Sequence, residues 1–170
     1  MAKIRDIAAR YSSLADDAVA VSDTSQLDKT LEWFGYSETY AQSAERLSLH
    51  GRELYLPWQQ LAGHALECAL RGCLQSARFD APVPHDLIAL FEQAESLGFQ
   101  LRDSELVMIV LVSHAYSHEP DRGTRYVPRH PMPFGVITQY SSPPSLRLNL
   151  ALRELRRQAL LRLGKCDAEA

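Results

Sequence analysis

The amino-acid sequence predicts an all-α fold, a bundle of four to six helices. Apolar residues recur at helical spacing through most of the chain, and the segments that carry them begin and end at residue types typical of helix caps. The only stretch with a β-like pattern, residues 135–140 (GVITQY), is short and isolated. A chain of 170 residues that is 46% hydrophobic is large enough to bury one continuous core.

Two or three helices are expected in the first third of the chain. Residues 1 to about 20 carry small apolar residues at positions i, i+3, i+4 and i+7 between charged ones, which favours a helix. The capping residues of the run DTS introduce a short helix over 27–34, which Gly35 is expected to end. Ser37 then offers a second N-cap, for a helix from about 38 to 55.

The central helix of the bundle is expected over residues 58–77. Pro57 suits its first turn, because the N–H that proline lacks would have no partner there. Apolar residues cover more than one side of this segment, which is typical of a helix surrounded by others. Further helices are expected over 85–97, over 145–163, and from an Asp-Ser cap at 103–104 through residue 116, with Pro120 and Gly123 as the end of this last one. A glycine follows each of the first two.

Composition and charge narrow the classes of function. The net charge of −3 provides no overall attraction to nucleic acid or to an anionic membrane. The beginning of the sequence does not resemble a signal peptide, and the longest apolar run, residues 106–112, is too short to span a bilayer. Cys68, Cys73 and Cys166 form no CxxC or Cys/His cluster, which favours thiols kept reduced. We therefore expect a cytoplasmic protein without a membrane segment.

Three short polar motifs follow one another along the middle of the chain. They are GHALECALRG with Glu67 and Arg71, the helix opening His85-Asp86-Leu87, and the pair Arg125-Tyr126. In this order they resemble the motifs of the HEPN family, small bundles of four to five helices found mostly in prokaryotes. The resemblance covers about residues 38–126.

The resemblance divides the chain into four parts. They are an N-terminal helical extension (1–37), the HEPN-like helical core (38–126), a proline-rich connection (127–144), and a basic amphipathic helix with its tail (145–170).

The resemblance also implies two functions, because some HEPN proteins are ribonucleases and others bind nucleotides or proteins. The first is a non-catalytic helical module that works as a homodimer and binds a protein partner or a nucleotide or RNA ligand. The alternative is a metal-independent endoribonuclease of a toxin–antitoxin or phage-defence system.

The ribonuclease signature of the family, an arginine followed four to six residues later by a histidine on one helix, fits this chain poorly. Arg125 and His130 have four residues between them, but Pro128 and Pro131 oppose a helix there. His114 and His118 lie on an expected helix, but no arginine precedes either of them at that distance. In the alternative function, Arg125 with His118 or His130 would position and protonate the phosphate.

The polar residues of the motifs are expected to form one network. Glu67 and Arg71 lie four apart on the central helix, in the order that favours an ion pair. His85 can cap its helix or bond Glu67, while Asp86 suits the positive end of that helix. Arg125 can fold back on Glu67. We expect this network to be structural, and Arg71 would recognise a phosphate if a ligand binds.

No metal or cofactor is expected. His114 and His118 lie four apart, but a zinc site needs a third ligand. The sequence contains neither HExxH nor the paired Glu-x-x-His motifs of di-iron bundles.

The last expected helix carries the largest local excess of positive charge in the chain. Residues 145–165 hold six basic side chains against one acidic, a local charge of +5. The first fifty residues hold eight acidic side chains against five basic, a local charge of −3. A solvated arginine face is the expected explanation, and contact with RNA or with an acidic partner is the alternative.

Overall fold

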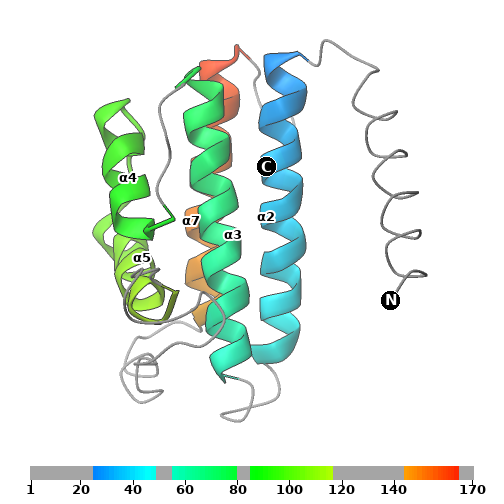
Figure 1. Cartoon of the computed structure of the whole chain (residues 1–170), viewed down its shortest axis with the longest axis vertical. Coiled ribbons are helices and arrows are strands. Elements are labelled where there is room, and N and C mark those ends of the chain that lie inside the picture. Colours follow the sequence, from blue (N-terminus) through cyan, green and yellow to red (C-terminus); the bar gives the residue numbers. More distant parts are fainter. Residues whose placement is uncertain (1–24, 49–54, 80–84, 117–143, 165–170) are drawn as a thin grey trace, which may run out of the picture.

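The computed structural model describes residues 25–48, 55–79, 85–116 and 144–164, and this part of the chain forms a bundle of five helices without strands (Figure 1). The predicted all-α bundle is therefore confirmed. The helices are α2 (Gln26–Ser48), α3 (Tyr55–Ser76), α4 (Leu87–Ser96), α5 (Asp103–Tyr116) and α7 (Pro144–Arg162). The helix expected over 1–20 and the stretch 135–140 lie outside the described residues. The same holds for the expected connection 127–144 except for its last residue, Pro144, which begins α7.

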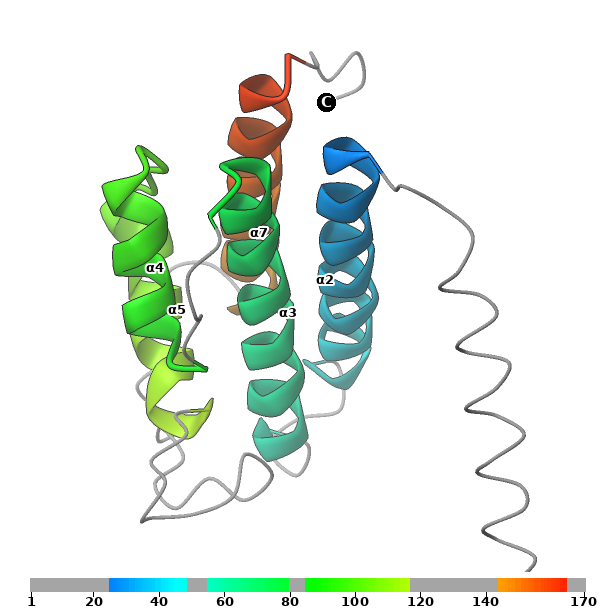
Figure 2. The same ribbon diagram turned by 45° about the horizontal axis from the view of Figure 1, so that its top comes forward.

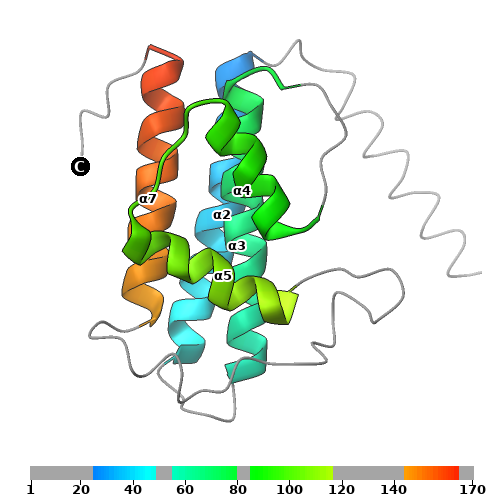
Figure 3. The same cartoon turned by 90° about the vertical axis from the view of Figure 1, so that its left-hand side faces the viewer.

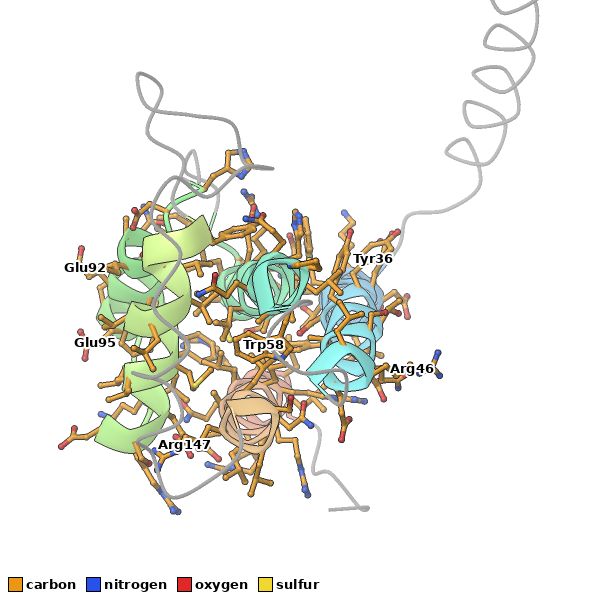
Figure 4. The ribbon with its side chains drawn as sticks, turned by 90° about the horizontal axis from the view of Figure 1, so that it is seen from below. Tyr36, Arg46, Trp58, Glu92, Glu95 and Arg147 are labelled. Carbon is orange, nitrogen blue, oxygen red and sulfur yellow. The ribbon has the colours of Figure 1, made fainter. Side chains whose placement is uncertain are left out.

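The three long helices α2, α3 and α7 lie side by side, with α2 running opposite to the other two (Figures 1 and 2). Helices α4 and α5 cover one side of this group, and α5 crosses α3 and α7 obliquely (Figure 3). Seen end-on, α2, α3 and α7 form a triangle whose α2–α7 side faces away from α4 and α5 (Figure 4). None of the described helices combines the length and the apolar character that crossing a bilayer would need.

Helix α3 is the central helix, as predicted, because it packs against each of the other four. Three small buried residues, Ala62, Ala65 and Ala69, allow its neighbours to come close. A Cβ atom on Gly72 would lie 2.8 Å from the ring of Phe34, so the glycine leaves room for that α2 side chain. These small residues explain how one helix can serve four neighbours.

The expected break in α2 was wrong. Gly35 lies inside one continuous helix, and Ser37 caps nothing, since its hydroxyl donates to the backbone oxygen of Ala65 at 2.8 Å. A glycine inside a helix costs roughly 1 kcal/mol relative to alanine, and the burial of two or three apolar side chains outweighs that cost. Phe34 and Ala41, on either side of the expected break, are both buried against the bundle. The expected boundary between residues 37 and 38 falls within α2.

Helix ends follow the local sequence more closely. At the start of α2, Ser25 and Asp28 bond each other's backbone N–H groups, both at 3.2 Å, in a reciprocal cap. Asp86 is the N-cap of α4 and accepts the N–H of Ala89 at 2.9 Å. Gly98, after α4, has a φ of +94°, a conformation that favours glycine. Asp103, expected as a cap, instead lies in the first turn of α5.

Helix α7 is fixed to the bundle by its buried leucines and by bonds at both ends. Near its start, the indole N–H of Trp58 lies 3.4 Å from the Ser145 hydroxyl, and a guanidinium nitrogen of Arg147 donates to the Ser104 carbonyl at 3.2 Å. Near its end, Arg162 donates to the Leu97 carbonyl at 2.6 Å. Two arginines of α7 thus bond backbone carbonyls of the segments around α4 and α5, so these side chains help to hold α7 against the bundle.

Candidate ligand site around Glu67

A buried carboxylate, that of Glu67 in the middle of α3, is the centre of the candidate site. Its Oε1 atom lies 3.0 Å from Nε and 2.9 Å from Nη2 of Arg71, one helical turn further on. The same oxygen lies 2.8 Å from Nδ1 of His85, just before the α4 cap. The ion pair and the bond across the bundle that were expected for these three residues are both present. Asp86 serves α4 as its cap instead.

The geometry fixes the roles of the donors at Oε1. A carboxylate oxygen accepts, so His85 carries its proton on Nδ1 and donates it to Glu67. The Arg71 Nη2 atom lies 3.2 Å from that same Nδ1, a contact between two donors that share one acceptor. The His85 side chain is 44% exposed, whereas that of Arg71 is 18% exposed. His85 therefore forms the more exposed side of the network.

Two further members of the network were not predicted. The phenolic oxygen of Tyr116, in the last turn of α5, lies 2.5 Å from the second Glu67 oxygen, Oε2, and 2.8 Å from Nδ1 of His64. A tyrosine has one proton to give, and the charged carboxylate is the stronger acceptor. Tyr116 therefore donates to Glu67, and His64 donates its Nδ1 proton to the tyrosine oxygen.

A glycine makes the Tyr116 bond sterically feasible. A Cβ atom on Gly63, one turn before Glu67, would overlap the Tyr116 ring. The sequence held a partial signal for this arrangement, since His64 lies three residues before Glu67 and so shares its helix face. The part played by Tyr116 depends on the angle at which α5 crosses α3, which no local pattern encodes.

Aromatic rings of α2 continue the network towards the surface. Trp33, Tyr36 and Tyr40 follow one another at i, i+3 and i+7, on one face of that helix. The Arg71 guanidinium carbon lies 5.7 Å from the centroid of the Trp33 ring, and Tyr40 stacks on His64 with ring centroids 5.0 Å apart. We call these three residues of α2 the aromatic strip.

Tyr36 is the most exposed member of the strip and projects outward on the side of α2 away from α7 (Figure 4). Its ring meets that of Trp33 edge to face, with centroids 6.4 Å apart. Its hydroxyl donates to a Glu32 oxygen at 3.0 Å, and this hydrogen bond raises the pKa of Tyr36. The exposed ring keeps its neutral form at physiological pH.

Four of the site residues predicted from the sequence lie outside the residues that the structure describes. Arg125, Tyr126, His118 and His130 fall in the segment 117–143, outside the described residues. Within the described ranges, no three His, Cys, Asp or Glu side chains gather as a metal site would need.

The network around Glu67 can therefore hold a negative charge below the surface, with neutral aromatic rings and a histidine beside it.

Comparison of the chain with protein-family models, with curated proteins and with solved structures gave no match.

Proposed function

We propose that this chain is a non-catalytic helical module of the HEPN-like type, which works as a homodimer and binds a protein partner or a nucleotide or RNA ligand. The observation that carries the proposal is the orientation of Arg71 and His85, both of which donate to the Glu67 carboxylate. Catalysis on a phosphate needs such donors aimed at the charge that develops on the substrate. Here the N–H groups of Arg71 and His85 donate to the protein's own carboxylate, which suits a structural or binding role.

The aromatic strip favours a ligand that carries nucleobases over a protein partner. Stacking of one base on an aromatic side chain contributes about 1–3 kcal/mol and tolerates any base. Because Arg71 is already paired with Glu67, affinity would come from stacking more than from phosphate contacts. Binding should therefore depend weakly on salt, in contrast to binding that releases many counterions.

A cleavage assay tests the absence of catalysis. The purified protein would be incubated without metal with tRNA and total RNA, beside an Arg125→Ala variant. We expect intact RNA over a wide range of protein concentrations. Cleavage that disappears in the variant would overturn the proposal and favour the endoribonuclease alternative, with catalysis in the segment after α5.

A fluorescence titration tests the ligand. The chain has two tryptophans, Trp33 and the buried Trp58. A Trp58→Phe variant therefore has Trp33 as its single tryptophan emitter. We expect short single-stranded oligoribonucleotides to quench it, and Tyr36→Ala to weaken binding about tenfold, the loss of roughly one stacking contact. Glu92→Ala, on the outer side of α4 (Figure 4), is the matched control and should leave binding unchanged. Quenching that Tyr36→Ala does not weaken would exclude the strip as the binding surface.

A further inference from the structure

A groove runs between α2 and α7, on the side of the bundle that faces away from α4 and α5 (Figure 4). Its volume is about 370 Å³. Phe34, Ala41 and Leu152 line it with apolar atoms, Glu38 and Glu45 stand on its α2 wall, and Arg153 and Arg156 stand on its α7 wall. The groove thus has an apolar floor between an acidic wall and a basic wall.

The rim of the groove on α7 is also apolar. Leu146 lines the groove at 49% exposure, and Leu150, one turn further on, is 46% exposed. Two leucines half exposed on one helix face beside an apolar groove are typical of a surface that another chain covers.

One ion pair joins the two walls of the groove, and it is loose. Arg156 and Glu38 lie 3.8 Å apart, and their side chains are 45% and 59% exposed. Three other arginines of α7 are bound elsewhere: Arg147 and Arg162 donate to backbone carbonyls, and Arg157 pairs with Glu154 at 2.6 Å. An exposed ion pair at long distance contributes little, so Glu38 and Arg156 can each still bind an opposite charge of a partner.

We propose that the α2–α7 face is the homodimer interface, with α2 of each copy packed against α7 of the other. This inference rests on the homodimer in the proposed function and names its surface. Helix α2 carries four acidic and two basic side chains, a charge of −2, whereas α7 carries five basic and one acidic, a charge of +4. The face is therefore acidic on one half and basic on the other.

Symmetry selects one of two face-to-face arrangements. A two-fold axis that lies in the interface across the helices would put α7 against α7, basic on basic. An axis that lies in the interface along the helices puts α2 against α7 of the partner and preserves heights along the bundle. Since Glu38 lies at the height of Arg156 in one chain, it then meets Arg156 of the partner subunit.

The size of the face suits a reversible dimer. The 19 residues of α7 give a length of about 28 Å at 1.5 Å per residue. Two adjacent helices are about 20 Å wide, so the flat face covers roughly 550 Å² on each subunit, or about 1,100 Å² in total, which is just below the range of stable interfaces and typical of weak ones. We therefore expect a dissociation constant in the low micromolar range or above, within reach of sedimentation measurements.

Charge exchange tests the arrangement. One variant carries Glu38→Arg and Glu45→Arg, which makes both walls basic, and the other carries Arg153→Glu and Arg156→Glu, which makes both walls acidic. Each alone should dimerise at least 100-fold more weakly than the parent in sedimentation equilibrium. An equimolar mixture should form a heterodimer, seen by native mass spectrometry, because opposite charges then meet in both halves.

Two controls keep loss of dimerisation separate from loss of folding. Glu92→Arg with Glu95→Arg reverses charges on the outer side of α4 (Figure 4) and should leave dimerisation unchanged. Leu150→Glu alters an exposed side chain and should weaken the dimer, while its melting temperature should equal that of the parent at concentrations where both are monomeric. Circular dichroism would establish that each variant is folded.

The outcomes separate this inference from the proposed function. If all variants dimerise like the parent, the interface lies elsewhere and the dimeric module stands. If folded charge variants are monomeric but their mixture does not pair, the two-fold arrangement is overturned. If the parent itself is monomeric at every concentration tested, the homodimer of the proposed function fails together with this interface.

Discussion

Replacing Glu67 by glutamine would keep the shape of the central side chain and remove its charge. The carboxylate has donors on both oxygens, with Arg71 and His85 at Oε1 and Tyr116 at Oε2. A glutamine amide has one oxygen and one NH₂ group, so each of its two orientations turns the NH₂ towards a donor. The less costly orientation keeps the oxygen at Arg71 and His85 and forces the Tyr116 hydroxyl to turn.

The cost can be estimated from these contacts. The bond from His85 becomes a neutral one, which contributes about 0.5–1.5 kcal/mol in place of about 1.5–3 kcal/mol, a loss of roughly 1 kcal/mol. Arg71 stays charged and keeps its bonds to an oxygen, but loss of the opposite charge costs roughly 1 kcal/mol more. Reorientation of the buried tyrosine adds about 1 kcal/mol, for a total of about 3 kcal/mol, close to what breaking a buried ion pair costs. For a chain of this length, that loss lowers the melting temperature by roughly 6–12 °C.

Urea denaturation followed by circular dichroism would measure this loss as a difference in the free energy of unfolding. Glu92→Gln, the same substitution at an outward-facing position of α4 (Figure 4), should change the free energy by less than about 0.5 kcal/mol. If Glu67→Gln were as stable as this control, the charge of the carboxylate would not hold the network together. Glu67 would then have no structural role that depends on its charge.

Other predictions follow from individual side chains. Gly35→Ala, in the middle of α2 with nothing within 4 Å of a new Cβ, should stabilise the protein by about 0.5–1 kcal/mol in urea denaturation. Gly63→Ala should destabilise it by about 2 kcal/mol or more, because the new methyl group displaces a packed aromatic ring; equal effects at the two glycines would contradict the packing described. Burial raises the pKa of the Cys73 thiol, so thiol reagents should modify the partly exposed Cys68 before Cys73, and modification of Cys73 should require unfolding; peptide mass spectrometry would locate the labels, and equal rates at these two cysteines would count against this burial. The guanidinium hydrogen-bonded to Glu154 lowers the pKa of that carboxyl, so its stabilising contribution is present above the unfolded pKa of about 4.3 and is lost as the pH falls through the folded value. The fall in stability below that pH should be smaller in Glu154→Gln, and an unchanged acid limb would refute this assignment.

Local sequence was sufficient to predict a helix end where the residues at that end determine it. Asp86 and Gly98 mark the two ends of α4, because a carboxylate cap and a positive φ are local requirements. The middle of α2 could not be predicted in this way. Gly35 and Ser37 resemble a stop followed by a start, and only burial against α3 decides that the helix continues.

In the candidate site, too, some contacts could be predicted from local sequence and others could not. The bond between Glu67 and Arg71 follows from their spacing of four on one helix. The bond between Tyr116 and Glu67 joins residues 49 positions apart and depends on how α5 crosses α3. The periodicity of a single helix does not determine that angle, so the sequence did not predict the bond from Tyr116.

The place of α7 in the bundle has a consequence for the order of folding during synthesis. Leu148, Leu155 and Ala159 fill the core between the earlier helices, and Ser145 bonds the Trp58 indole from a position 87 residues later in the chain. While α7 is still inside the ribosome, α2 and α3 can already pair, but their remaining apolar surface stays open to water. A nascent chain released before α7 is complete would therefore be a substrate for chaperones and proteases, and premature stop codons upstream of α7 should abolish soluble expression.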